Sequence, residues 1–404
     1  MPLIATAALF FLIGFVTWLN GPLISFVRVA FSLSDVEAFL IPLVFYLSYL
    51  GFALPAGKIA QHTGLKRGFA IALAIMGIGG AFFGQFIASR FYPGALAALM
   101  VLGAGLTLLQ VSVNPYISLL GPHDRAAQRI AIMGLCNKFA GILAPIVLAT
   151  VVMHDIGNVA LRAGQAATLT EREAILSSFA QGIYWPYLGM ALVLIIAAGG
   201  VMLSPLPDFG ASRSTKLTGA GFSFTPRLCG GILATFTYVG IEVLAGDAIG
   251  TYGQGFGLPL NETRFFTAFT LAAMMLGYVI GLLIVPRFLS QERCMFLSCA
   301  LGIVLSLAAF CTQGYVSVLC VALLGLANAM IMPALFPMAI RHAGSHTPVA
   351  SALLVMAFSG GAFTPQIFVF LKPYIGFQAT FAGLAVLSYG VVLSYAHRFA
   401  NDTP

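Results

Sequence analysis

The feature that most limits what this chain can fold into is a series of twelve apolar stretches, each suited to cross a lipid bilayer as one helix. A spanning helix needs about 20 predominantly apolar residues. The stretches run approximately over residues 4–26, 39–60, 69–86, 94–120, 130–153, 184–203, 228–252, 265–285, 295–310, 316–339, 350–371 and 379–395. With 60% of the 404 residues hydrophobic and only 8% charged, the composition excludes a soluble globular domain. The sequence therefore predicts an all-α integral membrane protein.

A polar interval divides the twelve stretches into two sets of six. Residues 204–227 are rich in Pro, Gly, Ser and Thr, and we expect them to form a cytoplasmic linker between an N-terminal half, residues 1–203, and a C-terminal half, residues 228–404. A second polar insert, residues 154–183, is expected to hold a short surface helix. Two six-helix halves joined in this way are typical of secondary transporters built from repeats.

The distribution of Lys and Arg indicates the orientation of the chain, since cytoplasmic segments of membrane proteins carry an excess of these residues. If both termini are cytoplasmic, 12 of the 19 Lys and Arg residues lie on the cytoplasmic side, 6 lie outside and Lys138 lies inside a span. We therefore expect a multi-pass, monomeric protein of a bacterial-type inner membrane with both termini in the cytoplasm. The net charge of +7 then reflects topology and not a nucleic-acid partner. The first stretch lacks a basic leader and is long enough to span, so we expect no cleaved signal peptide.

The sequence offers no chemistry for an enzyme. Its six cysteines are scattered through apolar segments without a CxxC or a Cys/His cluster, so we interpret them as packing residues and not as disulfides or metal ligands. The chain has no His-Glu-x-x-His, Gly-x-Ser-x-Gly or Walker motif, which argues against hydrolysis and against ATP coupling. We expect no catalytic residues, no metal and no cofactor apart from a coupling ion.

The fourth apolar stretch carries two amide side chains at membrane depth. Gln110 and Asn114 are four residues apart, which places them on one face of a helix. Amides in hydrocarbon need hydrogen-bond partners, so this face should point into the bundle or an aqueous cavity. Because a carboxamide both donates and accepts, as sugar hydroxyls do, we predict that Gln110 and Asn114 bind a polyhydroxylated solute, with Pro115 permitting a kink beside them. The alternative is that both amides bond only to neighbouring helices.

Several motifs resemble those of known transporters. The segment GKIAQHTGLKRG, residues 57–68, resembles the major facilitator motif Gly-x-x-x-Asp-Arg-x-Gly-x-Lys/Arg-Lys/Arg, with Gln61 and His62 in place of the Asp and Arg. Three further segments resemble, in the same order along the chain, the fucose/galactose/glucose symporter family of that superfamily: FFLIGFVTWLNGPLI (10–24), LTLLQVSVNPYISLLGP (106–122) and YVGIEVLAGDAIGTYG (238–253).

This resemblance implies a major facilitator fold, with twelve transmembrane helices in two pseudo-symmetric six-helix halves, and the activity of a cation-coupled sugar symporter. Fucose-type members carry acids at the positions that match Gly21 and Gln110. Both acids are absent here, so the chain is more similar to the glucose/galactose and N-acetylglucosamine branch. A proton site therefore cannot be transferred to either position from the resemblance.

Further side chains in the apolar stretches are candidates for contact with the substrate. Asn20 precedes Gly21 and Pro22, which would interrupt the first helix and expose backbone groups. Trp18, one turn from this interruption, is suited to stack on the apolar face of a pyranose, and the alternative role for its indole is anchoring at the bilayer interface. The remaining candidates, for which a helix contact is the alternative, are Tyr46, Tyr49, Asn137, Asn328 and Gln366.

The seventh apolar stretch holds Glu242 close to its middle and Asp247 nearer its outer end. Inserting an ionised carboxylate at the bilayer centre costs about 3 kcal/mol, so we expect Glu242 to have a function. In the functional interpretation Glu242, with Asp247 as a second acid, binds the coupling cation, which is either a proton or a sodium ion near Glu242. The alternative is a structural ion pair between Glu242 and Lys138 across the two halves. Unpaired, Lys138 would snorkel to the cytoplasmic surface.

Three function classes compete for a chain of this kind. The sequence favours a cation-coupled importer of a monosaccharide such as glucose, galactose or N-acetylglucosamine, with two halves that rock about a central site. An exporter of drugs or other amphiphiles has the same architecture but favours an apolar cavity, and a membrane enzyme lacks its motifs. Two glycine-rich segments, Gly77-Ile78-Gly79-Gly80 and Ser359-Gly360-Gly361, are expected to allow the close helix approach that moving halves require.

Overall fold

The computed structural model describes residues 2–120, 126–207, 224–285, 288–341, 343 and 347–399, and every regular element within these ranges is helical. Twelve helical spans in the described chain are long and apolar enough to cross a membrane. The predicted all-α, multi-pass membrane protein with twelve spans is thereby confirmed. Residues 208–223 of the expected linker lie outside the described ranges.

The spans are built from helices that are continuous or broken once or twice. The helices of the N-terminal half are α1 (Pro2–Thr17), α2 (Asn20–Phe31), α3 (Asp35–Ala38), α4 (Leu40–Thr63), α5 (Leu65–Ala88), α6 (Tyr92–Leu119), α7 (Ala126–Val151), α8 (Ile156–Gln165), α9 (Leu169–Gln181) and α10 (Tyr184–Leu203). The helices of the C-terminal half are α11 (Pro226–Asp247), α12 (Ile249–Gln254), α13 (Leu260–Thr263), α14 (Phe266–Ile284), α15 (Gln291–Cys311), α16 (Gly314–Asn328), α17 (Ile331–Ile340), α18 (Thr347–Met356), the 3₁₀-helix η3 (Ala357–Ser359), α19 (Gly360–Ile375) and α20 (Phe377–Phe399). The polar insert at residues 154–183, expected to hold one short helix, holds both α8 and α9.

The first, seventh and tenth spans are interrupted, the first and the tenth of them next to a proline near the start of the second helix. Pro22 is the third residue of α2 and has no N–H, so the carbonyl of Trp18 loses the donor that a continuous helix would supply four residues later, and α1 ends one residue before Trp18. Pro333 occupies the same place in α17, and α16 ends at Asn328. The seventh span is interrupted at Ala248, between α11 and α12. Interrupted helices are a recurring feature of substrate and ion sites in transporters.

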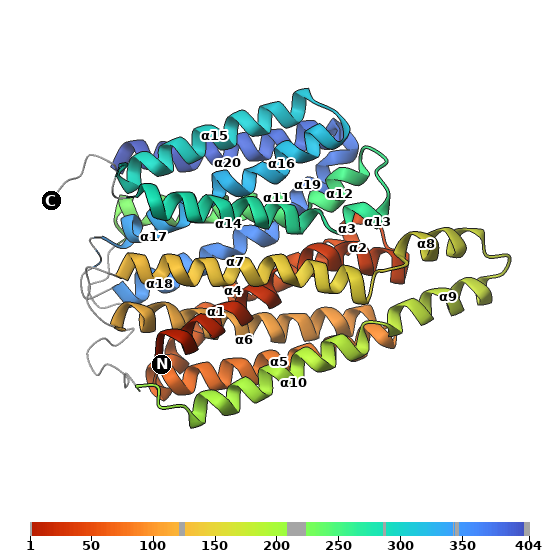
Figure 1. The fold of residues 1–404 in the computed structure, drawn as a ribbon, viewed down its shortest axis with the longest axis horizontal. Coiled ribbons are helices and arrows are strands. Elements are labelled where there is room, and N and C mark those ends of the chain that lie inside the picture. The colour runs from red at the N-terminus through yellow and green to blue at the C-terminus, as the bar shows by residue number, and fades with distance from the viewer. Residues whose placement is uncertain are drawn as a thin grey trace.

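Figure 1 shows the red-to-yellow helices of the N-terminal half below most of the green-to-blue helices of the C-terminal half. The start of α1 and the end of α20 lie at one end of the bundle, on the left in Figure 1. The opposite end, called the distal end from here on, holds α3, α8, α9, α12 and α13. The halves meet where α7 packs against α14 and where α4 packs against α18, η3 and α19.

Glycine permits the closest helix contacts. A Cβ on Gly79 of α5 would lie 2.5 Å from the backbone nitrogen of Leu102 on α6. A Cβ on Gly360 of α19 would lie 1.8 Å from the carbonyl oxygen of Phe236 on α11. Both distances are too short for any side chain, so the predicted close helix approach is present at both glycine-rich segments, in each case within one half. Their part in a movement of the halves stays a prediction.

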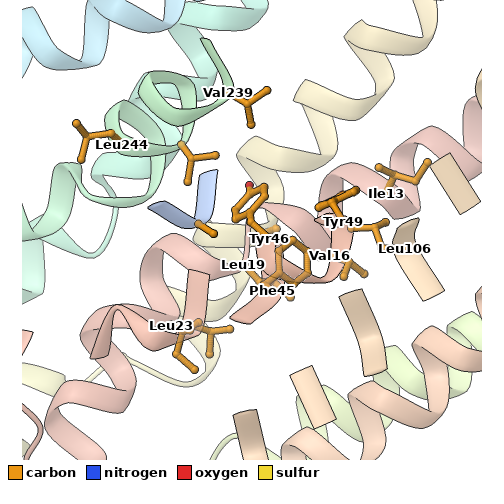
Figure 2. Packing of buried hydrophobic residues seen from close by; sticks show 14 of the residues in the cluster. Ile13, Val16, Leu19, Leu23, Phe45, Tyr46, Tyr49, Leu106, Val239 and Leu244 are labelled. Atoms are coloured by element: carbon orange, nitrogen blue, oxygen red, sulfur yellow. The ribbon is translucent and has the colours of Figure 1, made fainter. Parts of the chain in front are cut away.

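Apolar side chains fill the interface between the halves. Figure 2 shows Leu19, Phe45 and Tyr46 of the N-terminal half together with Val239 and Leu244 of α11, all members of one buried cluster that extends through both halves. Because lipid is as apolar as these side chains, their contribution to stability comes mainly from close packing and not from exclusion of water. The polar groups set into this packing are therefore the ones that call for an explanation.

The distal end carries a group of polar contacts between the halves. Asp35 of α3 accepts a hydrogen bond from Arg28 of its own half at 2.7 Å and pairs with Lys372 of α19 in the other half. We call Arg28, Asp35 and Lys372 the distal latch. Beside it, the Gln366 amide of α19 donates to the carbonyl oxygen of Val36 at 3.2 Å. Gln366, a candidate for substrate contact, thus takes part in the polar contacts between the halves at the distal end.

A second set of contacts joins the halves on the α8 side of the distal end. The N–H of Gly157 on α8 donates to Oδ1 of Asn261 on α13 at 3.2 Å. The guanidinium of Arg264 donates to the carbonyl oxygen of Met153. The two halves are therefore held together at the distal end on both sides of their interface.

Candidate functional site

Lys138 and Glu242 form an ion pair between the two halves. Lys138 lies at the middle of α7, and its Nζ is 2.8 Å from Oε1 of Glu242 on α11. The two side chains are only 8% and 14% exposed, so Lys138 is buried and does not snorkel. The pairing that the sequence left as an alternative is therefore present. In this conformation the Glu242 carboxylate is paired with the Lys138 ammonium. A role of Glu242 in ion coupling stays a prediction.

We call Lys138 and Glu242 the central charge pair, and Trp18 packs against it. Its ring faces the Lys138 ammonium, with Nζ 4.5 Å from the ring centroid, a distance at which a cation is attracted to the π-face. A Cβ on Gly141 of α7 would lie 2.6 Å from Cδ1 of the indole, and a Cβ on Gly246 of α11 would lie 2.6 Å from Cζ3. The indole thus fits between two glycines of opposite halves and is 3% exposed. In this conformation Trp18 is buried between the two halves and packs against both.

Four tyrosines lie within electrostatic range of the Glu242 carboxylate. Tyr238 precedes Glu242 by one turn of α11, and the others are Tyr46 of α4, Tyr278 of α14 and Tyr389 of α20. Glu242 therefore lies near one cation and four phenol side chains.

Asp247, the last residue of α11, lies where two interrupted spans meet. A Cβ on Gly21 of α2 would stand 3.2 Å from Oδ1 of Asp247 and 2.4 Å from Oγ1 of Thr267. Only glycine leaves room at this position, which we call the helix-break junction (Gly21, Asp247 and Thr267). Asp247 is 1% exposed. The backbone N–H of Gly21 lies near its carboxylate, but neither carboxylate oxygen makes a hydrogen bond of normal geometry with a described residue. Asn20, next to Gly21, is also 1% exposed, and its Nδ2 likewise has no partner in the described chain.

Gln110 uses its amide to join two helices of the N-terminal half. Its Nε2 donates to the hydroxyl of Tyr49 on α4 at 2.7 Å. The Tyr49 ring contacts Phe358 of η3 in the other half, with the ring centroids 5.6 Å apart. Gln110 therefore lies one contact away from the interface between the halves. Asn114, its predicted partner, has a side chain that lies outside the described residues.

The remaining candidates lie apart from the charge pair or reach it indirectly. Asn137 donates from Nδ2 to the carbonyl oxygen of Phe10 at 3.4 Å, where α1 and α7 pack closely. Asn328, at the end of α16, accepts from the Tyr389 hydroxyl at 2.8 Å and, through its backbone carbonyl, from Tyr238 at 3.1 Å. It thus reaches the surroundings of Glu242 through Tyr238 and Tyr389.

The structure gathers Trp18, Lys138 and Glu242 and places Asp247 at the neighbouring junction, but it leaves Gln366 at the distal end. Sequence reasoning missed Tyr238, Tyr278 and Thr267. The spacing of four residues between Tyr238 and Glu242 is a local signal that they share a helix face. No local pattern marks Tyr278 or Thr267, since each reaches the site only through packing of α14 against other helices.

Comparison with known proteins gives a consistent result for both sequence and fold. The model of the family described as Major Facilitator Superfamily matches residues 6–365. A glucose/galactose transporter of Brucella abortus is 29% identical over 393 residues, which cover 96% of this chain and 91% of that protein. An L-fucose-proton symporter of Escherichia coli is 23% identical over 412 residues, covering 100% and 94%.

A solved structure shares the whole architecture. The crystal structure of the transporter FucP in the outward conformation matches with a TM-score of 0.79 and 22% identity, covering 100% of this chain and 99% of that one. At this identity the likeness establishes the fold. The pseudo-symmetric arrangement of twelve helices expected from the sequence motifs is thereby confirmed.

Proposed function

Because the chain belongs to the Major Facilitator Superfamily, we propose that it is a cation-coupled importer of a monosaccharide such as glucose, galactose or N-acetylglucosamine. The names of its relatives, a glucose/galactose transporter and an L-fucose-proton symporter, support this substrate class. Transport by alternating access, and not catalysis, is the activity. The protein acts as a monomer with the sugar, the coupling ion and the lipid bilayer as its partners.

The observation that carries the proposal is the polar site at the interface of the halves. Lys138, Glu242 and Asp247 bring ionisable groups to this interface. The Gln110 amide, one contact away from it, offers a donor and an acceptor that match sugar hydroxyls. An exporter of amphiphiles would favour an apolar surface at the same place. These polar groups therefore favour a polyhydroxylated solute over a drug-like one.

We further propose that the distal end faces outward and that both termini lie in the cytoplasm of a bacterial-type inner membrane. Under this orientation the majority of Lys and Arg outside the spans is cytoplasmic, as the positive-inside rule requires. The distal latch then closes the outer mouth. In the same proposal the coupling ion, a proton or a sodium ion, binds in the region of the two membrane-embedded acids Glu242 and Asp247.

Uptake into proteoliposomes tests this function. Purified full-length protein is expected to exchange labelled glucose, galactose or N-acetylglucosamine across the membrane, with competition by unlabelled monosaccharides that ranks the substrates. An imposed proton or sodium gradient, applied separately, should drive accumulation with one of the two ions. If no monosaccharide is exchanged and the vesicles instead extrude amphiphilic dyes, the importer is ruled out in favour of the exporter.

Replacing Gln110 by Ala is expected to weaken sugar binding. Loss of one hydrogen bond, worth about 0.5–1.5 kcal/mol net, corresponds to an affinity lower by about 2- to 12-fold. Titration calorimetry on purified protein measures the change. Tyr49→Phe is the matched control, because it removes the hydroxyl that Gln110 contacts while leaving the amide free for sugar. An unchanged affinity in well-folded Gln110→Ala protein would eliminate Gln110 as a sugar ligand.

A further inference from the structure

Asp247 differs from the other membrane-embedded acid in having no cation of its own. The charged and titratable groups that face it are Glu242 on the same helix, Lys138 on α7 and Tyr46 on α4. Lys138 is already paired with Glu242 at 2.8 Å, and Tyr46 carries no positive charge. The carboxyl of Asp247 is thus 1% exposed without a hydrogen bond of normal geometry or a countercharge of its own among the described residues.

An ionised carboxylate in this setting is unfavourable. Moving an isolated charged group from water into an apolar interior carries a large desolvation cost, which the group avoids by becoming neutral. Binding of one proton is enough to make a carboxylate neutral. A sodium ion would need a set of oxygen ligands, as in transporters where unwound carbonyls hold it. A proton needs no further ligand, so it is the simpler way to keep Asp247 neutral here.

The position of Asp247 links its exposure to the movement of the halves. Asp247 ends α11 in the C-terminal half, and Gly21 of α2, which lies against it, belongs to the N-terminal half. The Gly246 residue beside it packs against Trp18 of the same half as Gly21. Separation of the halves along this contact would give water access to the carboxyl, whereas closure buries it as in the present structure.

We propose that Asp247 is the residue that carries the coupling proton and that Glu242 is not, which rests on the proposed function of sugar import. In the outward-open state the Asp247 carboxylate takes a proton from water outside, forming one O–H bond. In the inward-open state this bond breaks and the proton passes to cytoplasmic water. Between these states the acid is neutral and buried at the helix-break junction.

Transport assays on Asp247 variants test the proposal. In proteoliposomes the wild type should show sugar counterflow without a gradient and sugar accumulation under an inwardly directed proton gradient. Asp247→Asn should retain counterflow but only equilibrate the sugar under the proton gradient, and its sugar binding should lose the pH dependence of the wild type. Asp247→Glu, which keeps a carboxyl, should recover part of the accumulation. The exposed acid Glu171 of α9 supplies the control Glu171→Gln, which should accumulate sugar as the wild type does.

Other outcomes would overturn the assignment. Proton-driven accumulation by Asp247→Asn, or wild-type accumulation under a sodium gradient alone, would contradict it. If Asp247→Asn fails to fold, labelling of the wild type with dicyclohexylcarbodiimide, which reacts with protonated carboxyls in apolar surroundings, takes its place. Modification mapped to Asp247 supports the proposal, and modification of Glu242 without Asp247 contradicts it. Absence of any sugar counterflow by the wild type would instead refute the proposed function itself.

Discussion

Replacing either member of the central charge pair alone, as Lys138→Met or as Glu242→Gln, should destabilise the protein by about 3–5 kcal/mol, whereas the double replacement should recover most of this loss. The reason is the burial of both side chains at the interface of the halves. A single replacement leaves one buried charge without its partner, and the double replacement removes both charges. Lys138→Met also withdraws the cation that faces the Trp18 ring.

A double-mutant cycle measures this coupling. The amount of monodisperse protein and its apparent melting temperature in detergent are compared for the wild type, the two single variants and the double variant. The pair of Arg90 and Glu173 serves as the matched control, because its side chains are 20% and 61% exposed and pairs with an exposed partner contribute only about 0–1 kcal/mol. If the single variants at Lys138 and Glu242 were as stable as those at Arg90 and Glu173, the pair would not be buried in the protein as it exists in the membrane.

The twelve spans were predictable because the property that defines them is local. A stretch of about 20 apolar residues is visible in any window of that length, and the breaks in α1–α2 and α16–α17 follow from Pro22 and Pro333 in the same way. Glycine-rich segments such as those that contain Gly79 and Gly360 likewise predict a close helix contact without identifying the partner helix. Each of these signals depends on a few neighbouring residues and on no tertiary contact.

The composition of the site was less predictable because it depends on how helices from different halves meet. The sequence resemblance marks Gly21 as a position where fucose-type members carry an acid, but no pattern in the sequence shows that Asp247 of the other half lies beside it. The sequence predicts a sugar contact for Trp18, but no local pattern places its indole between Gly141 and Gly246, which are more than 100 residues from each other. The sequence predicts a substrate contact for Gln366, and its position beside the distal latch could not be foreseen because it depends on the packing of α19 against α3.

The contacts at the distal end are numerous but individually weak. The side chains of Arg28, Asp35 and Lys372 are 18–26% exposed, and partly exposed ion pairs contribute about 0–1 kcal/mol each. Such a closure can open when the equilibrium between the outward and inward conformations shifts by a few kcal/mol, as a ligand with different affinities for the two states can bring about. A single strong bond at this place would instead hold the protein in one state.

Tying the distal latch covalently should therefore abolish transport. Cysteines at the positions of Asp35 and Lys372, introduced into a variant without the six native cysteines, are joined by a short bifunctional thiol reagent that is cleavable by reductant. Because these side chains pair across the halves, the linked protein cannot open its distal end, and sugar uptake should fall to the level of protein-free vesicles. Cleavage of the linker should restore uptake, and either cysteine alone should leave it unaffected by the reagent. Undiminished sugar uptake by protein whose cross-link is verified by mass spectrometry would show that substrate does not pass between the halves at this end.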